Sequence, residues 1–309
     1  MRFRPALATG VALLALAFSA GGAVGAPSTH ARTLDVVATT TQLQDLVRNV
    51  GGARVSVTGI LKPNVDPHEY EPKPSDAVAL SGAKLIVESG VGLDRWMDKL
   101  IGEAGGSAPV FVASSGLKIR PGDSEEPDGD PHWWHDPVNF EQAARSLARE
   151  LGKVDPSNRA SYDANAARYV AQLQAMDAAN VRTFRAVPVA DRKLVTNHDA
   201  FRYFAAHYHV TILGSVLDSL STAAQPSARD ISDLIAKIRK AHVKAIFTES
   251  SINPKLEEQI ASEAGVKVYA DLYGDTLGPA GSNGATYLKM ERWNVTAIVA
   301  GLLGRPLPR

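Results

Sequence analysis

One segment of the sequence limits the choice of folds more than any other. Residues 155–187 contain no glycine, and Pro156 is their only proline, so nothing breaks a helix there before Pro188. Asp155 suits a helix N-cap and Pro156 a first helical position. Apolar side chains recur three or four positions apart along the segment: Tyr162, Ala166, Tyr169, Leu173 and Met176. Roughly 30 residues make a helix near 45 Å, long enough to join two lobes, although a surface helix within one lobe is the alternative.

Short apolar runs lie on both sides of this segment and are typical of buried strands. The runs before it are residues 34–40, 54–61, 83–89 and 109–114, and those after it are residues 193–197, 210–216, 243–249 and 266–271. Helix-like stretches separate them, such as residues 73–83, where Ser75 suits the N-cap. The alternation predicts an α/β fold of two (β/α) lobes with parallel sheets, joined by one long helix. The predicted divisions are residues 32–154 for the N-terminal lobe, 155–187 for the linking helix and 188–309 for the C-terminal lobe.

The first 31 residues have the pattern of a targeting segment rather than of a folded domain. Arg2 and Arg4 precede an apolar run that ends near residue 20, and small residues follow it. This order is typical of a secretory signal, so we expect residues 1–31 to be a signal peptide and N-terminal tail. The mature protein is then expected to be periplasmic or secreted. No cysteine follows the apolar run, so we expect no lipid anchor.

The composition excludes several kinds of site. The chain has no cysteine, so a metal can be held only by histidine, aspartate or glutamate. The formal net charge is zero, which gives no sign of binding to nucleic acid. The sequence has no HExxH helix, no GxSxG turn and no phosphate-binding glycine loop. We therefore expect a monomer that is not an enzyme and binds no nucleic acid.

Four residues able to bind a metal follow predicted strands. His68 comes after the strand at 54–61, His132 after 109–114, and His198 directly after 193–197. Asp275 comes after the strand at 266–271. Taken singly, each of the four could be an ordinary loop or capping residue. Because ligands bind at the carboxyl ends of parallel strands, their common placement predicts a metal site in the cleft between the lobes.

Three further features lie near these residues. His135 follows His132 by three positions, and we expect it behind the site or at its rim. The acidic run at residues 122–130 is interpreted as a solvated loop, with weak cation capture or partner docking as the alternative. Glu249 closes a predicted strand and is expected to face the cleft, orienting a ligating imidazole.

The ordered motifs resemble those of the cluster 9 solute-binding proteins of bacterial zinc and manganese ABC importers. The motifs are LDVVATTTQLQDLVRNVGG, DPHEYEPKPSD, DPHWWHDPVN, NHDAFRYF and, around Asp275, DTLG, and the resemblance spans residues 34 to 302. It implies two lobes joined by one long helix, with the metal between them, and an ABC importer membrane permease as partner. Carried over by motif, it implies His68, His132, His198 and Asp275 as ligands. The chain departs from the family at His135, where an apolar residue is more common, and in having an acidic run instead of a histidine-rich loop.

The expected ligand set is informative about the metal. Three imidazoles and one carboxylate suit four-coordinate Zn(II), and nitrogen-rich ligation favours zinc over manganese. We therefore expect a receptor that captures Zn(II) as its transported ligand and delivers it to an importer. Mn(II) capture is the alternative within the same class. A secreted zinc metallochaperone, or a zinc hydrolase with Glu249 as general base, would be different classes of protein.

Overall fold

The computed structural model describes Met1, residues 33–105 and residues 107–307. The predicted signal peptide therefore lies outside the described residues, apart from Met1. Within the described ranges, no helix combines the length and the apolar character needed to cross a membrane.

The first half of the chain forms a four-stranded parallel sheet with the strand order β2-β1-β3-β4. Its strands are β1 (Leu34–Ala38), β2 (Val55–Gly59), β3 (Leu85–Glu88) and β4 (Val110–Val112). The helices of this half are α1 (Thr41–Gly51), α2 (Pro74–Ser81), α3 (Trp96–Ala104) and α4 (Pro137–Val154). Strands alternate with helices, which confirms the predicted architecture in this half. A parallel crossover usually contains a helix, which returns the chain to the end of the sheet where the previous strand began.

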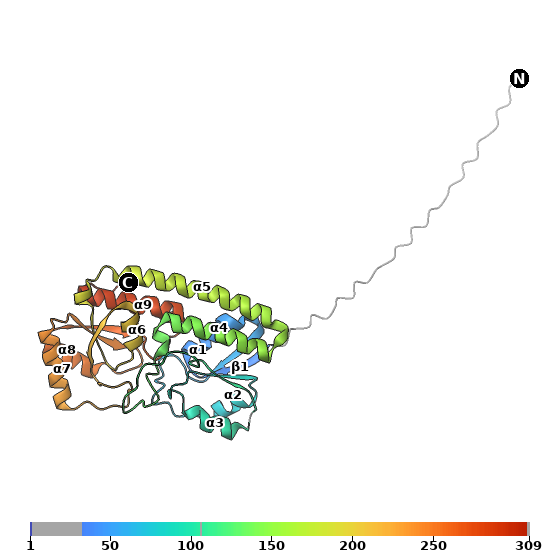
Figure 1. The fold of residues 1–309 in the computed structure, drawn as a ribbon, viewed down its shortest axis with the longest axis horizontal. Helices are drawn as coiled ribbons and strands as arrows, with labels where there is room; N and C mark the ends of the chain where they lie inside the picture. The colour runs from blue at the N-terminus through green and yellow to red at the C-terminus, as the bar shows by residue number, and fades with distance from the viewer. Residues whose placement is uncertain (2–32, 106, 308–309) are drawn as a thin grey trace. The chain divides into compact units, whose positions relative to one another are not determined.

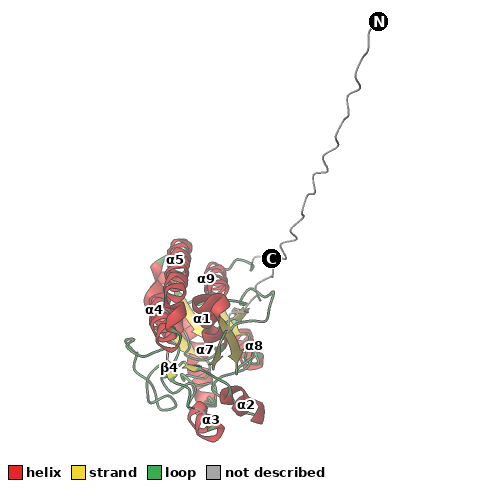
Figure 2. Ribbon diagram, turned by 90° about the vertical axis from the view of Figure 1, so that its right-hand side faces the viewer, coloured by secondary structure: helices red, strands yellow, loops and turns green. Residues whose placement is uncertain are grey.

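The second half contains two parallel strand pairs, β5 with β6 and β7 with β8. These strands are β5 (Lys193–Thr196), β6 (Thr211–Ser215), β7 (Ala245–Glu249) and β8 (Lys267–Leu272). The helices are α6 (Arg202–Tyr208), α7 (Ala228–Lys240), α8 (Lys255–Ala264) and α9 (Tyr287–Leu303). Figure 2 shows strands lying between helices, as expected for a sheet that is buried on both faces.

The long helix is α5 (Arg159–Phe184), whose 26 residues correspond to about 39 Å. It runs beside α4 and α9 (Figure 1) and contributes Tyr162 and Tyr169 to one buried core and Phe184 to another. A single long helix that joins two cores is therefore confirmed. Contacts group Thr33–Arg309 as one unit, so the division into lobes at the predicted boundaries stays a proposal.

One predicted helix start is confirmed in position and another was wrong. Residues Pro156–Asn158 form a 3-10 turn with Asp155 at its N-cap position and Pro156 first, and the α-helix continues from Arg159. The Asp155 carboxylate accepts hydrogen bonds from the side chains of Tyr162 and Asn158 rather than from the helix backbone. Helix α2 begins at Pro74 and not after Ser75, because proline presets the first turn and Asp76 accepts the backbone N–H of Lys73.

His207 is half-buried and connects three helices, whereas His209 is exposed. On α6, its ring nitrogens lie 3.1 Å from Asp136, the N-cap of α4, and 2.8 Å from Asp177 on α5. Burial alone would lower the pKa of His207, but hydrogen bonds to the two carboxylates outweigh it and raise the pKa to about 10. The hydrogen bonds of His207 also lower the pKa of Asp177, although burial opposes them.

We expect His207→Gln to destabilise the protein by on the order of 1–3 kcal/mol between pH 4 and pH 6.5. A raised pKa adds stability that is complete below the unfolded value of about 6.5 and is lost as the pH rises through 10. A lowered aspartate pKa adds stability that is lost below about pH 4. Denaturant unfolding of the parent and the variant at several pH values measures the difference. A difference that stays constant from pH 5 to pH 10 contradicts this account.

Candidate metal centre

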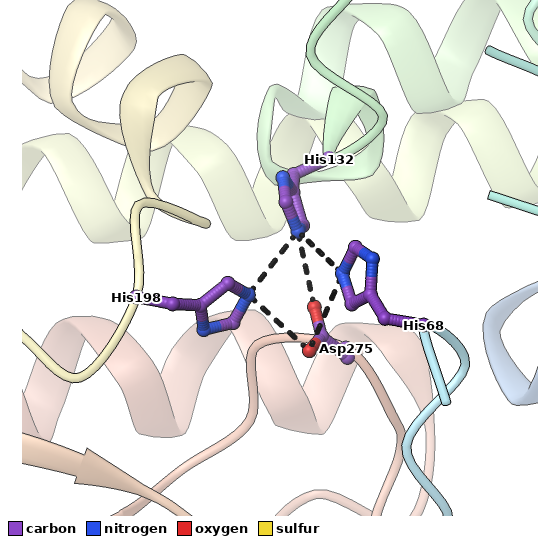
Figure 3. Close-up of side chains that lie close together, drawn as sticks. All are labelled: His68, His132, His198 and Asp275. Atoms are coloured by element: carbon purple, nitrogen blue, oxygen red, sulfur yellow. Dashed lines mark hydrogen bonds and ion pairs between the residues drawn. The ribbon is translucent and has the colours of Figure 1, made fainter. Parts of the chain in front are cut away.

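Four loops that follow strands bring the four expected residues to one point (Figure 3). His68 follows β2, His132 follows β4, His198 directly follows β5, and Asp275 follows β8. One nitrogen from each histidine and one carboxylate oxygen all lie within 4.8 Å of one another. The side chains of all four are at most 1% exposed. The carboxyl ends of parallel strands thus place the residues as the topology rule predicts.

His132 lies at the centre of this group. Its Nε2 is 3.4 Å from Nε2 of His68, 3.3 Å from Nε2 of His198 and 3.2 Å from Oδ1 of Asp275. Oδ2 of Asp275 is 3.3 Å from Nε2 of His198 and 3.9 Å from Nε2 of His68. Neither oxygen of this buried carboxylate has a hydrogen-bond donor. A buried carboxylate beside three converging ring nitrogens needs a shared cation or protons to offset its desolvation.

Nδ1 of His198 faces two oxygen acceptors. Oε1 of Glu249, the last residue of β7, lies 2.9 Å from it, and Oδ1 of Asn197 lies 3.3 Å from it. The side chains of His198 and Glu249 are fully buried. When Nδ1–H donates to this carboxylate, the lone pair of Nε2 is left facing the group of four. This arrangement is typical of metal-ligating histidines. An orienting role for Glu249 stays a prediction.

The acidic run supplies the corresponding partners for the other two histidines. Oε1 of Glu126 lies 3.0 Å from Nδ1 of His68, and Oδ1 of Asp130 lies 2.9 Å from Nδ1 of His132. Glu126 is 6% exposed and Asp130 is fully buried. The interpretation of this run as a solvated loop was therefore wrong for both residues, because each carboxylate is paired with a buried imidazole.

A repeated triplet marks two of the histidines and could have pointed to Asp130. His68 and His132 each end the sequence Asp-Pro-His, and the aspartate of each triplet accepts the histidine's backbone N–H. The distances are 2.9 Å from Asp66 to the first and 3.0 Å from Asp130 to the second. Aspartate favours such turns two residues ahead, and proline limits the chain between them. The turn thus holds the backbone of both histidines through local hydrogen bonds.

His135 lies behind the site and not at its rim. Its Nε2 donates to the carbonyl oxygen of Gly274 at 3.0 Å, and its Nδ1 lies 3.2 Å from Glu291 on α9. Nε1 of Trp134 donates to the same carbonyl at 3.0 Å. These bonds tie the segment of His132 to the residue that precedes Asp275. A Cβ at Gly274 would overlap the carboxylate of Glu249, which would have to move away from its present place.

The carboxylates around the site control the protonation of its histidines. Burial would lower the pKa of His132, but Asp130 and Asp275 outweigh it and raise the pKa to about 9. Burial would also lower the pKa of His198, but Glu249 and Asp275 outweigh this effect and raise the pKa. Burial would raise the pKa of Asp275, but the histidines hold it well below its ordinary value. The raised pKa values of His132 and His198 and the lowered pKa of Asp275 thus have one cause, the pairing of buried imidazoles with carboxylates.

Comparison with known proteins finds relatives that are similar to this chain over most of its length. Residues 36–301 match the family described as zinc-uptake complex component A, periplasmic (ZnuA). The metal ABC transporter substrate-binding lipoprotein ScbA of Streptococcus cristatus is 30% identical over 94% of this chain and 97% of its own length. The manganese ABC transporter substrate-binding lipoprotein PsaA of Streptococcus pneumoniae is 29% identical over 87% of this chain and 89% of its own. The periplasmic zinc-binding protein TroA of Treponema pallidum has a similar structure, with a TM-score of 0.82 and 32% identity over 88% of this chain and 99% of that one.

Proposed function

This chain belongs to the ZnuA family of metal ABC transporter substrate-binding proteins, and from that premise we propose that it captures Zn(II) outside the cytoplasmic membrane for an ABC importer. The observation that carries the proposal is the buried group of three imidazole nitrogens and one carboxylate. We propose Nε2 of His68, His132 and His198, together with Asp275, as the ligands. Three nitrogen donors and one oxygen donor suit four-coordinate zinc and favour zinc over manganese in intrinsic affinity.

The surroundings of the four residues support carriage rather than catalysis. A catalytic zinc has three protein ligands and an open position for water, whereas here four side chains converge, one from each of four residues. Glu249, the candidate general base of the hydrolase reading, is fully buried with its Oε1 2.9 Å from Nδ1 of His198. It therefore supports a ligand instead of facing a substrate pocket. The membrane permease of the importer is the proposed partner, and it takes the metal over from this site.

Mn(II) is the second candidate for the transported metal. The relative from Streptococcus pneumoniae is named as a manganese protein, at 29% identity. Both oxygens of Asp275 face the three histidines, which would let the carboxylate add a further oxygen donor for a metal that prefers oxygen ligands. The choice between the two metals is therefore a question of measured affinity.

The location follows from the same proposal. A protein that supplies an importer works outside the cytoplasmic membrane, as the predicted signal peptide requires. The related proteins of the streptococci are named lipoproteins, whereas this chain has no cysteine. We propose a periplasmic or secreted monomer, and its lack of a lipid anchor stays a prediction.

We expect one tightly bound Zn(II) per chain, because one group of three or more ligating side chains occurs among the described residues. Titration of the metal-free protein against a competing chelator, with Mn(II) in parallel, measures stoichiometry and affinity. The matched control is His209→Asn, which removes an exposed histidine from a left-handed backbone position that asparagine tolerates. This variant should bind as the parent does. Tighter binding of Mn(II) than of Zn(II) would overturn the zinc assignment.

A further inference from the structure

The acidic run at residues 122–130 forms a loop that contacts both halves of the chain. In the first half, Nη2 of Arg95 lies 2.8 Å from Asp128 of the loop and 4.0 Å from Glu126. In the second half, the backbone N–H of Leu220 donates to Asp123 of the loop at 2.7 Å. The loop therefore crosses from one half to the other beside the metal site.

The turn within the loop fixes the backbone of Glu126. Oδ1 of Asp123 accepts the N–H of Glu125 at 3.0 Å and that of Glu126 at 2.8 Å. The carbonyl oxygen of Glu126 accepts the N–H of Asp123 at 3.2 Å and that of Gly129 at 3.3 Å. Gly122 is needed at the close approach, because a Cβ there would overlap the Glu126 carbonyl oxygen. The backbone of Glu126 is therefore held by bonds that do not involve His68.

The side chain of Glu126 reaches the one proposed ligand whose residue is not fully buried. Glu126 lies 58 positions from His68 in sequence, yet its Oε1 is 3.0 Å from Nδ1 of that ring. The backbone of His68 is bonded only locally, to Asp66 in its own turn. The Nε2 side of the His68 ring faces the other proposed ligands, and Glu126 is the partner of its Nδ1 side.

We propose that Glu126 is a positioning residue for His68 that contributes to the preference for Zn(II) over Mn(II). By accepting the Nδ1–H of His68, Glu126 keeps the lone pair of Nε2 directed at the metal. The inference rests on the proposed function, because it assigns a role toward the same bound metal. Without Glu126, His68 becomes a mobile donor, and the site depends more on the carboxylate and two imidazoles. Losing nitrogen ligation reduces the intrinsic advantage of zinc, so binding of Zn(II) should suffer more than binding of Mn(II).

The test compares variants of the full chain at positions 126 and 128. Glu126→Ala removes the acceptor, whereas Glu126→Gln keeps an amide oxygen that can accept the same N–H. Asp128→Ala is the matched control, since it removes one negative charge from the same loop at a residue that is 60% exposed in its side chain. Glu126→Met removes the acceptor while filling more of the space, and serves if the alanine variant does not fold. Zn(II) and Mn(II) affinities are measured by chelator competition on each metal-free protein.

We expect Glu126→Ala and Glu126→Met to weaken Zn(II) binding about 10–100-fold, the usual effect of losing a partner of a ligating histidine. Their Mn(II) binding should fall less. Glu126→Gln should stay within about fivefold of the parent, because the hydrogen bond is kept without its charge. Asp128→Ala should bind both metals as the parent does.

Four results would overturn the inference. They are parent-like Zn(II) binding by Glu126→Ala, an equal loss of Zn(II) and Mn(II) binding, a loss in Glu126→Gln as large as in Glu126→Ala, and an equal loss in Asp128→Ala. A parent protein that binds neither metal contradicts the proposed function itself. A parent that binds Zn(II) tightly while Glu126→Ala does the same contradicts only the role of Glu126.

Discussion

Lowering the pH from 7.5 to 5 is expected to weaken Zn(II) binding by at least about 10⁴-fold, because three imidazoles must each be neutral to bind the metal. This figure assumes histidines that titrate freely at a reference pKa of about 6.5. In the structure, Asp130 and Asp275 outweigh burial and raise the pKa of His132 to about 9. The pKa of His198 is raised as well, by Glu249 and Asp275. A raised pKa lets protons compete at higher pH, so the loss should begin above pH 7.5 and be steeper than the reference case.

Chelator competition at constant ionic strength from pH 5 to pH 9 measures this dependence. Unfolding of the metal-free protein at each pH serves as the control that the chain remains folded. An affinity that does not change with pH is incompatible with three histidine ligands.

Replacing Asp275 with alanine is expected to lower Zn(II) affinity by roughly 100–1,000-fold, and by more than replacing Glu249 does. A site of four ligands binds zinc with about 10–16 kcal/mol, so one ligand accounts for about a quarter, and water can fill part of the opened position. Both oxygens of Asp275 face the histidines and lack a hydrogen-bond donor. Glu249 contacts only the far nitrogen of the His198 ring, so Glu249→Ala should cost at most about 10–100-fold.

The measurement is the Zn(II) affinity of both variants, with a structure of each. Glu249→Gln is a useful companion, since it keeps an acceptor for the Nδ1–H of His198 in the same volume. If Asp275→Ala binds as the parent does while Glu249→Ala loses the metal, the fourth ligand has been assigned to the wrong carboxylate.

The parts of the fold and site that repeat a regular pattern could be predicted from the sequence. All eight strands occur where apolar runs predict them, because the strand residues that pack into the core are mostly apolar. The strand ends then indicate where His68, His132, His198 and Asp275 lie, since parallel strands all end at the same edge. No side-chain contact had to be known for either step.

The parts that depend on partners far away in the sequence could not be predicted. Charge alone makes residues 122–130 resemble a solvated loop, but Glu126 is buried by an imidazole 58 positions away. No periodic pattern in the sequence around His135 indicates that its partner is Glu291 on α9. Asp155 stands at the predicted cap position, but its carboxylate accepts from the hydroxyl of Tyr162, a partner that local capping rules do not include.

Because all four proposed ligand side chains are buried, the affinity for the metal and the rate of its exchange become separate properties. Since at most 1% of each side chain is exposed, we expect a competing molecule to reach a metal bound there only after the surrounding chain moves. The speed of exchange is then set by that movement, a step that affinity does not determine. A receptor built in this way keeps its cargo during diffusion even where stronger chelators are abundant. Unloading then depends on a partner that holds the protein open, which ties release to the place where the cargo is used.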